Sequence, residues 1–223
     1  MINVDKVYST VNYILSKNNG LSISPAQFNN YAEIASNALQ DDYRGANTAK
    51  KVSYGRDRTL DSRLRQHRVP EHPISLDLLG YGDVPEDWVQ TLSLRTTDYQ
   101  PIRPIDEDRV AMAYQDPYTR PSADEMWYED LRRAGDTSDR AAIKVHPAGD
   151  ASVVMSYLRR PVKAVYAYTT VNRRSVFDPI NSVNFDWDES QFGELVFRIA
   201  QLCGVSLDKG QLIQYTQAKM AEE

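Results

Sequence analysis

The chain has 223 residues, of which 41% are hydrophobic and 26% charged, and its formal net charge is −5. The acidic balance argues against a general nucleic-acid binder, and a lone cysteine, Cys203, excludes an intramolecular disulfide framework. Because no apolar run reaches about 18 residues and the N-terminus has no apolar signal-peptide core, we expect a globular protein without a membrane span. We expect it in a cytoplasm, or in a particle assembled there.

Residues 1–43 are predicted to form a helical hairpin. Apolar side chains recur at the i, i+3, i+4 spacing of one helical face over residues 3–17 and again over residues 25–43. The turn between them, "SKNNGLSIS" (residues 16–24), has the outline of an EF-hand loop. It contains no carboxylate, however, and a calcium loop depends on several. We therefore favour a tight connection, with Ser24 as the N-cap of the second helix and Pro25 as its first residue.

Residues 44–69 form a basic arm. It has eight Arg or Lys against two Asp, a net +6, which leaves −11 for the rest of a chain whose total is −5. Three interpretations stay open for it: a solvated loop, docking on an acidic face of a neighbouring copy, or contact with nucleic-acid phosphate. The candidate subunit-interface residues are Arg56, Arg58, Arg63, Arg65 and Arg68.

Residues 70–183 are predicted to form an inserted, β-rich subdomain. The pattern predicts a strand over residues 88–97 and a short helix after Asp106, with Glu107 and Asp108 in its first turn. The densest β signals lie between residues 126 and 171, where we expect a small antiparallel meander.

Residues 184–223 are predicted to be helical and to complete a bundle with the N-terminal hairpin. One apolar face runs along "FGELVFRIAQLC" (residues 192–203), and Gly204 suits the position after a helix end. The predicted fold class is therefore α+β: N- and C-terminal helices forming a helical bundle, with an inserted small antiparallel β subdomain.

Nothing in the sequence predicts an enzyme, a metal site or a cofactor. His67 and His72 flank Pro70 and lack the spacing of a metal pair, while His146 precedes a proline and is interpreted as a turn residue. Cys203 is expected to be a buried, inert thiol. Acidic clusters at residues 41–42, 106–108 and 186–189 could serve acid–base chemistry, but each lies at a helix boundary, where capping explains acidity.

Long stretches of the chain resemble structural proteins of short-tailed, crAss-like phages that infect Bacteroidota. They are "VDKVYSTVNYILSKNNGLSISPAQFNNYAEIASNALQDDYRG", "RVAMAYQDPYTRPSADEMWYEDL", "AAIKVHPAGDASVVMSYLRRPVKAVYA" and "FDWDESQFGELVFRIAQLCGVSLDKGQLIQYTQ". The organisation also resembles head-to-tail adaptors, in which a helical bundle carries an inserted β subdomain. The resemblance covers nearly the whole chain apart from the basic arm.

The resemblance implies a virion protein of the neck or tail that forms a homo-oligomeric ring, commonly dodecameric, around the DNA exit channel. Its expected partners are other copies of itself, the portal protein and neighbouring tail rings, and DNA would pass through without being specifically bound. The alternative is a small, non-viral binding or regulatory helical module that responds to calcium through the hairpin.

Overall fold

The computed structural model describes residues 1–20, 22–51, 63–118, 120–132, 141–149, 152–171 and 174–204. The chain divides into two compact units. The helical unit comprises residues 1–66 and 161–223, and the β unit comprises residues 67–160. No helix in the described ranges is both long and apolar enough to cross a membrane.

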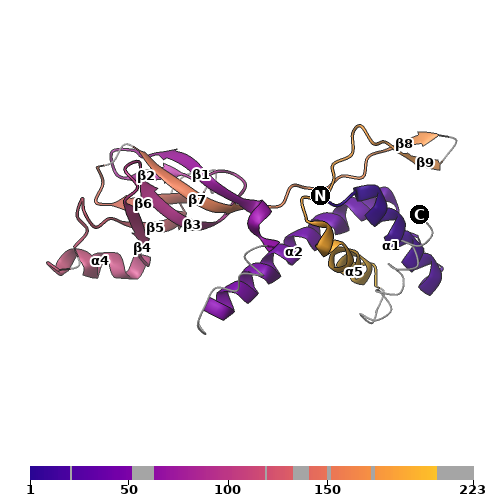
Figure 1. The fold of residues 1–223 in the computed structure, drawn as a ribbon, viewed down its shortest axis with the longest axis horizontal. Coiled ribbons are helices and arrows are strands. Elements are labelled where there is room, and N and C mark those ends of the chain that lie inside the picture. Colours follow the sequence, from indigo (N-terminus) through magenta and orange to yellow (C-terminus); the bar gives the residue numbers. More distant parts are fainter. Residues whose placement is uncertain are drawn as a thin grey trace. The chain divides into compact units, whose positions relative to one another are not determined.

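In the described ranges of the helical unit there are three α-helices: α1 (Val4–Asn19), α2 (Pro25–Lys51) and α5 (Phe192–Leu202). Helix α5 packs against both α1 and α2 (Figure 1). A short 3-10 turn, η2 (Glu189–Gln191), leads directly into α5. The predicted hairpin ended at residue 43, but α2 extends to Lys51 and so includes the first eight residues of the basic arm.

The helix ends follow local capping chemistry. The side chain of Asn3 accepts hydrogen bonds from two backbone N–H groups in the first turn of α1, and Gly20 ends that helix in the left-handed conformation at φ 65°. The predicted cap of α2 is confirmed: the Ser24 hydroxyl accepts from the backbone N–H of Gln27, whose side chain accepts from the backbone N–H of Ser24. Gly204, at φ 82°, follows the end of α5 as predicted.

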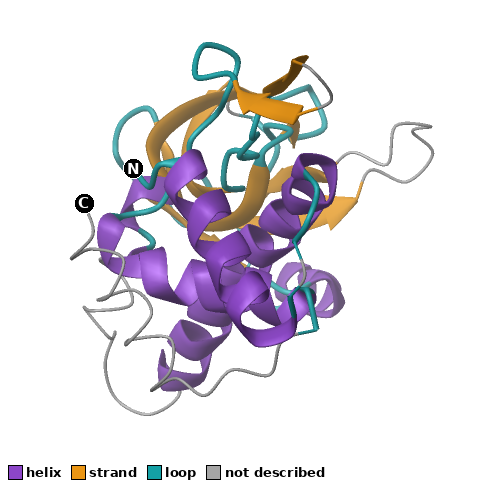
Figure 2. Cartoon of the chain, turned by 90° about the vertical axis from the view of Figure 1, so that its right-hand side faces the viewer, coloured by secondary structure: helices purple, strands orange, loops and turns teal. Residues whose placement is uncertain are grey.

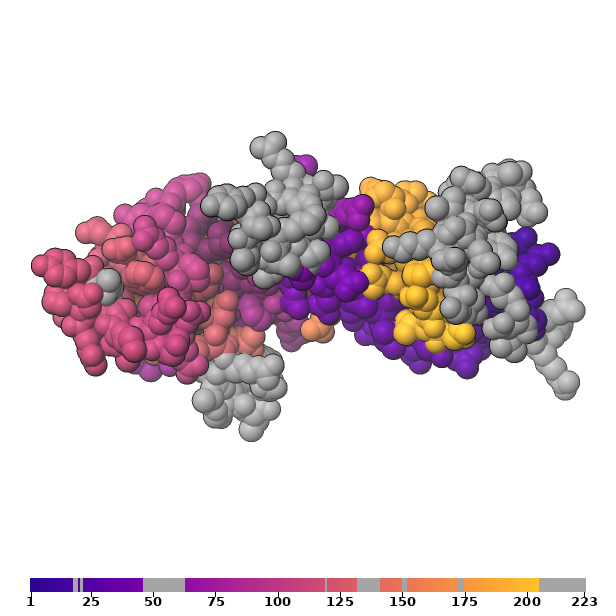
Figure 3. All heavy atoms as spheres, turned by 90° about the horizontal axis from the view of Figure 1, so that it is seen from below, coloured from indigo at the N-terminus to yellow at the C-terminus, as the bar shows by residue number. Residues whose placement is uncertain are grey.

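The core of the helical unit is closed by the segment before α5. The backbones of Ile2 and Phe185 exchange two hydrogen bonds, of 3.2 and 3.0 Å. Trp187 is fully buried, and its indole N–H donates to the hydroxyl of Ser36 on α2 at 2.7 Å. Figure 3 shows the atoms of α5, in yellow, lying against the indigo and violet atoms of α1 and α2.

The β unit is a seven-stranded sheet with the order β1-β7-β3-β4-β5-β6-β2. In chain order its strands are β1 (Arg68–Ser75), β2 (Tyr81–Asp83), β3 (Trp88–Thr96), β4 (Pro101–Pro104), β5 (Trp127–Arg132), β6 (Ala141–His146) and β7 (Ser152–Arg159). The 3-10 turn η1 (Arg65–His67) precedes β1, and helix α4 (Glu107–Gln115) connects β4 to β5. All neighbouring strands are antiparallel except β4 and β5, which are parallel.

The sheet is nearly closed, and its curvature can be followed in orange in Figure 2. The two end strands, β1 and β2, meet at Gly82. A Cβ added there would lie 2.5 Å from Cγ2 of Ile74 and 2.8 Å from Cδ2 of Leu76, so only glycine permits this approach. Ten buried side chains form the hydrophobic core of this nearly closed sheet. They are Ile74, Leu94, Ile102, Met126, Tyr128, Ile143, Val145, Val153, Met155 and Tyr157.

The predicted fold class is therefore wrong. The largest feature is a nearly closed seven-stranded sheet, and the protein is a mixed α/β protein, not a helical bundle carrying a small antiparallel insert. Nor is the sheet a meander, because the consecutive strands β6 and β7 pair with other strands and not with each other. The strand predicted over residues 88–97 and the short helix after Asp106 are confirmed as β3 and α4.

Prolines explain why the sequence predicted fewer strands than the sheet contains. Strand β1 contains Pro70 and Pro73, but it lies at one end of the strand order and pairs only with β7, through a register shift between Val69 and His72. Proline is tolerated on such a strand because the missing N–H costs a hydrogen bond only on a paired side. Strand β4 is four residues long and begins and ends in proline, so it also resembles a turn.

Truncating a core side chain of α5 tests this packing. Leu195 is fully buried, so Leu195→Ala should lower the free energy of unfolding by about 2–5 kcal/mol through lost contacts and a residual cavity. Urea denaturation followed by helical circular dichroism measures it. Leu202→Ala on the same helix, where the side chain is 40% exposed, is the matched control and should change stability by less than about 1 kcal/mol. Equal losses in the two variants would contradict the assigned core.

Candidate functional site

Among the described residues of the helical unit, a β-hairpin and the loop that follows it carry five exposed large apolar side chains. Strands β8 (Tyr168–Val171) and β9 (Arg174–Phe177) pair only with each other, and all four residues of β8 are exposed. We call its exposed apolar side chains the hairpin patch: Tyr168, Val171, Val176, Ile180 and Val183. An isolated two-stranded hairpin is marginally stable in water. In the register of β8 and β9, Val171 and Val176 lie on one face and Tyr168 on the other, so the hairpin exposes apolar side chains on both faces.

The base of this hairpin is firmly anchored to α1 and α2. The side chain of Asn29 accepts from the backbone N–H of Tyr166 at 2.8 Å and donates to its carbonyl at 3.2 Å. The Tyr166 ring stacks between those of Tyr8 and Phe177, with centroid distances of 4.2 and 4.9 Å. The patch therefore extends from a fixed base, as a pre-organised contact surface requires.

The loop after β9 is shaped by Asp178. Its carboxylate accepts from the backbone N–H groups of Ile180 and Asn181 and from the side-chain amide of Asn181. The Asn181 amide is the main cause of a lowered Asp178 pKa, because these bonds favour the charged form. This turn fixes the backbone at Ile180, whose side chain is 90% exposed.

The five candidate interface arginines do not form one described cluster. Arg56 and Arg58 lie outside the described residues. Arg63 donates to the hydroxyl of Tyr43 at 3.2 Å, with its guanidinium 5.2 Å from the ring centroid, so it has a partner within its own unit. Arg65 is exposed in η1, and Arg68 begins β1 half-buried. Their contact with a neighbouring copy stays a prediction.

Tyr43 also joins α2 to α5. Its hydroxyl donates to Glu194 at 2.6 Å, and Arg198 binds both Glu194, at 3.2 Å, and Asp42, at 2.5 Å. Burial, followed by the hydrogen bond to Glu194, raises the pKa of Tyr43 to about 12. Asp42 therefore has a structural role at the interface of the two helices.

Sequence reasoning missed a buried polar cluster in the β unit. His146 is not a turn residue: it is 5% exposed, and its Nε2 lies 2.8 Å from the carboxylate of Glu129, itself 5% exposed. A carboxylate accepts, so Nε2 donates to Glu129, while Nδ1 shares a hydrogen bond of 3.0 Å with the hydroxyl of Tyr114 on α4. Lys144 lies 3.9 Å from the same carboxylate. In the sequence, the only indication that His146 is buried is its place at the end of a predicted strand. The proline that follows favoured a turn and obscured that indication.

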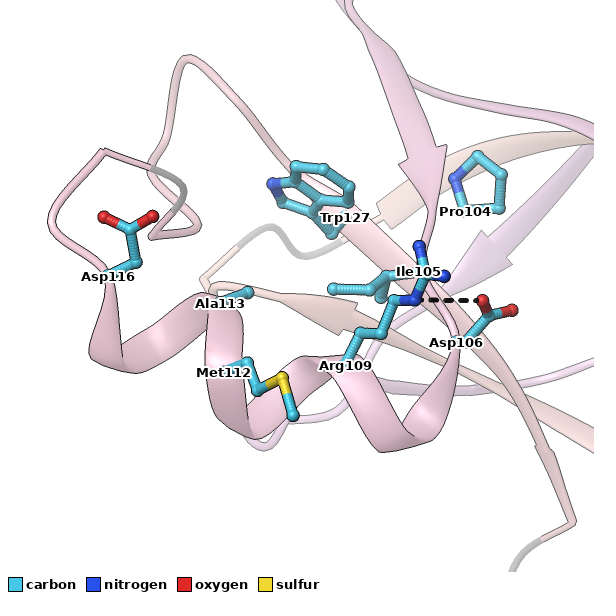
Figure 4. A pocket seen from close by; sticks show the side chains of 8 residues that line it. All are labelled: Pro104, Ile105, Asp106, Arg109, Met112, Ala113, Asp116 and Trp127. Carbon is cyan, nitrogen blue, oxygen red and sulfur yellow. Dashed lines mark ion pairs between the residues drawn. The ribbon is translucent and has the colours of Figure 1, made fainter.

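A cleft of about 400 Å³ lies between α4 and the sheet, as Figure 4 shows. Its walls are largely apolar, and charged residues lie at the two ends of the helix. The lining residues are Pro104, Ile105, Asp106, Arg109, Met112, Ala113, Asp116 and Trp127. Tyr114 and His146 help to hold α4 at this distance from the sheet.

The remaining predicted site residues have structural partners. Asp106 occupies the N-cap position of α4 without a side-chain cap hydrogen bond, and its carboxylate pairs with Arg109 at 3.7 Å. Asp188 caps η2 by accepting from the backbone N–H of Ser190. Across the described ranges, no group of three His, Cys, Asp or Glu side chains is placed to hold a metal ion. Cys203 was expected to be buried but is partly exposed, and desolvation raises the pKa of its thiol, which disfavours the reactive thiolate.

Comparison with known proteins assigns no family. No protein-family model matches the chain, and no curated protein matches it.

Calcium should not stabilise the protein through the α1–α2 connection. In the described part of this connection, residues 16–20 and 22–24, there is no carboxylate, and Gly20 serves as a helix cap. A ligand of the native state must raise the melting temperature, so thermal melts in excess calcium and in chelator should coincide. A calcium-dependent rise that is lost in Asn18→Ala would restore the calcium-responsive hypothesis.

Removing the Asn29 side chain should loosen the base of the hairpin. Asn29→Ala deletes two hydrogen bonds that together contribute about 1–3 kcal/mol. Amide hydrogen exchange at Tyr166 should therefore accelerate about five- to a hundredfold. The exposed neighbour Asn30 provides the control substitution Asn30→Ala. Unchanged exchange at Tyr166 would show that the aromatic stack alone holds the hairpin.

Proposed function

We propose that this chain is a non-enzymatic structural protein of a phage virion, a head-to-tail connector or tail ring component. Its copies form a homo-oligomeric ring around the DNA exit channel and contact the portal protein or a neighbouring ring. The hairpin patch is the observation that carries this proposal.

The hairpin patch suits a subunit contact for two reasons. Its five apolar side chains extend from a base that hydrogen bonds and stacked rings hold in place, so little conformational freedom is lost when a partner binds. The outer edges of β8 and β9 have no strand partner in the described structure, so they can accept a strand from another chain.

The resemblance to crAss-like phage proteins supplies the setting of the proposal. It supports a position in the neck or tail, and rings of this kind are commonly dodecameric. An overall charge of −5 suits a wall past which DNA slides without being held.

A charge placed in the hairpin patch should block assembly without unfolding the monomer. Val176 is 47% exposed on β9, so Val176→Asp should leave the melting temperature of the monomer unchanged. Burying an unpaired carboxylate in a subunit contact should weaken association by at least about tenfold. Sedimentation equilibrium, alone and on isolated portal complexes, measures the effect.

Ser175→Asp is the matched control, because Ser175 is the exposed neighbour of Val176 on the same strand. It introduces the same charge without replacing an apolar side chain. If Val176→Asp assembles as the unchanged chain does, the hairpin patch is not a subunit contact and the proposal loses its main support.

A further inference from the structure

Helix α4 stands away from the sheet and leaves an apolar cleft beneath it. Ala113 is the only buried residue of this helix, and Met112 is 71% exposed. The cleft walls formed by Ile105, Met112 and Trp127 could cover the apolar part of an incoming side chain.

Trp127 provides a specific polar contact in this cleft. Its indole nitrogen is buried and has no hydrogen-bond partner among the described residues. Figure 4 shows its ring beside the cleft, opposite the helix. Buried N–H groups normally donate to an acceptor, and a backbone carbonyl of an incoming segment would satisfy this one.

The rim of the cleft is acidic. Asp106 and Asp116 line the cleft at the two ends of α4, and Arg109 is the one cation among residues 106–116. Arg109 pairs with Asp106 across 3.7 Å, which leaves Asp116 in the lining to bind a visiting cation. Glu107 and Asp108 do not line the cleft, but they are exposed in the first turn of the same helix and add to the negative charge near its entrance. An anion such as nucleic-acid phosphate would be repelled here.

These features together match an arginine or lysine side chain. Its aliphatic stem would lie along the apolar walls and the face of Trp127, and its charged head would reach the carboxylates at the rim. The basic arm, residues 44–69, is a sequence of suitable charge within this chain: it carries +6, and the remainder carries −11.

We propose that the α4 cleft receives the basic arm of a second copy of this chain. The inference rests on the proposed ring and names one of its subunit contacts. A cyclic ring needs two different, complementary surfaces on every subunit, so that each copy offers one surface and receives the other. The acidic cleft and the basic arm form such a pair.

Charge reversal and charge exchange test the contact. Glu107→Lys/Asp108→Lys should weaken assembly at least about tenfold, because like charges then face each other. Adding Arg56→Glu/Arg58→Glu to the same chain should recover most of the loss. Glu86→Lys/Asp98→Lys is the control, since it changes net charge equally at exposed residues of the β unit that lie neither on α4 nor in the cleft lining.

Isotope-mixed crosslinking identifies the partner. The ¹⁵N-labelled and unlabelled full chains are mixed and treated with a carbodiimide, which joins carboxylates to amines. We expect links from Lys50 or Lys51 to Glu107 or Asp108 that combine one labelled and one unlabelled peptide. Links confined to one copy, or no such links, would overturn the proposal.

The outcomes separate this inference from the function on which it rests. If the chain forms rings and Glu107→Lys/Asp108→Lys forms them equally well, the cleft contact is wrong and the ring proposal stands. If neither the unchanged chain nor any variant assembles, alone or with portal complexes, both are wrong.

Discussion

The helical unit depends on a contact between its N-terminal segment and the segment that follows the β unit. The backbone bridge between Ile2 and Phe185, the buried Trp187 and the apolar face of α5 close a core that α1 and α2 alone would leave open to water. This closure is possible because the β unit begins and ends at the same place, where Arg68 pairs with Leu158 across β1 and β7. A folded insert whose ends lie side by side costs the surrounding unit little loop entropy. The same closed core also holds the base of the β8–β9 hairpin, through Asn29 and Tyr166.

The two candidate contact surfaces differ in their physics. The hairpin patch offers apolar area on a fixed base, which favours affinity, because burying such area is the main driving force of association. The α4 cleft combines apolar walls with carboxylates, and this charge makes binding specific for a basic partner in one orientation. A ring protein needs both properties, since each copy must bind firmly and only in the register that closes the ring. The polar cluster of Tyr114, His146 and Glu129 is not a contact surface; it positions α4 and so keeps the cleft open.

Sequence reasoning succeeded where structure is decided within a few residues. The cap at Ser24, the position of Gly204 after α5 and the strand β3 depend on nearby residues, and these were predicted correctly. Sequence reasoning failed where the structure depends on contacts between residues far apart in the chain. The closure of the sheet depends on Gly82 meeting Ile74 and Leu76, and the parallel pairing of β4 with β5 follows from the path of α4 between them. The prolines of β1 and β4 concealed strands because their missing N–H groups are tolerated only in particular pairings. The cleft could not be predicted because Met112 on α4 and Trp127 on β5 meet only through the tertiary fold, and no periodic pattern in the sequence connects them.

The central claim is that this chain is a ring-forming structural protein, and particle mass tests it most directly. Light scattering and negative-stain imaging of the purified full chain, alone and mixed with portal complexes, give both the mass and the shape of whatever forms. The account predicts ring-shaped particles whose mass is a fixed multiple of 25.4 kDa, either free or seated on the portal. A chain that stays monomeric at every concentration, and that binds neither the portal nor assembled tails, would contradict it.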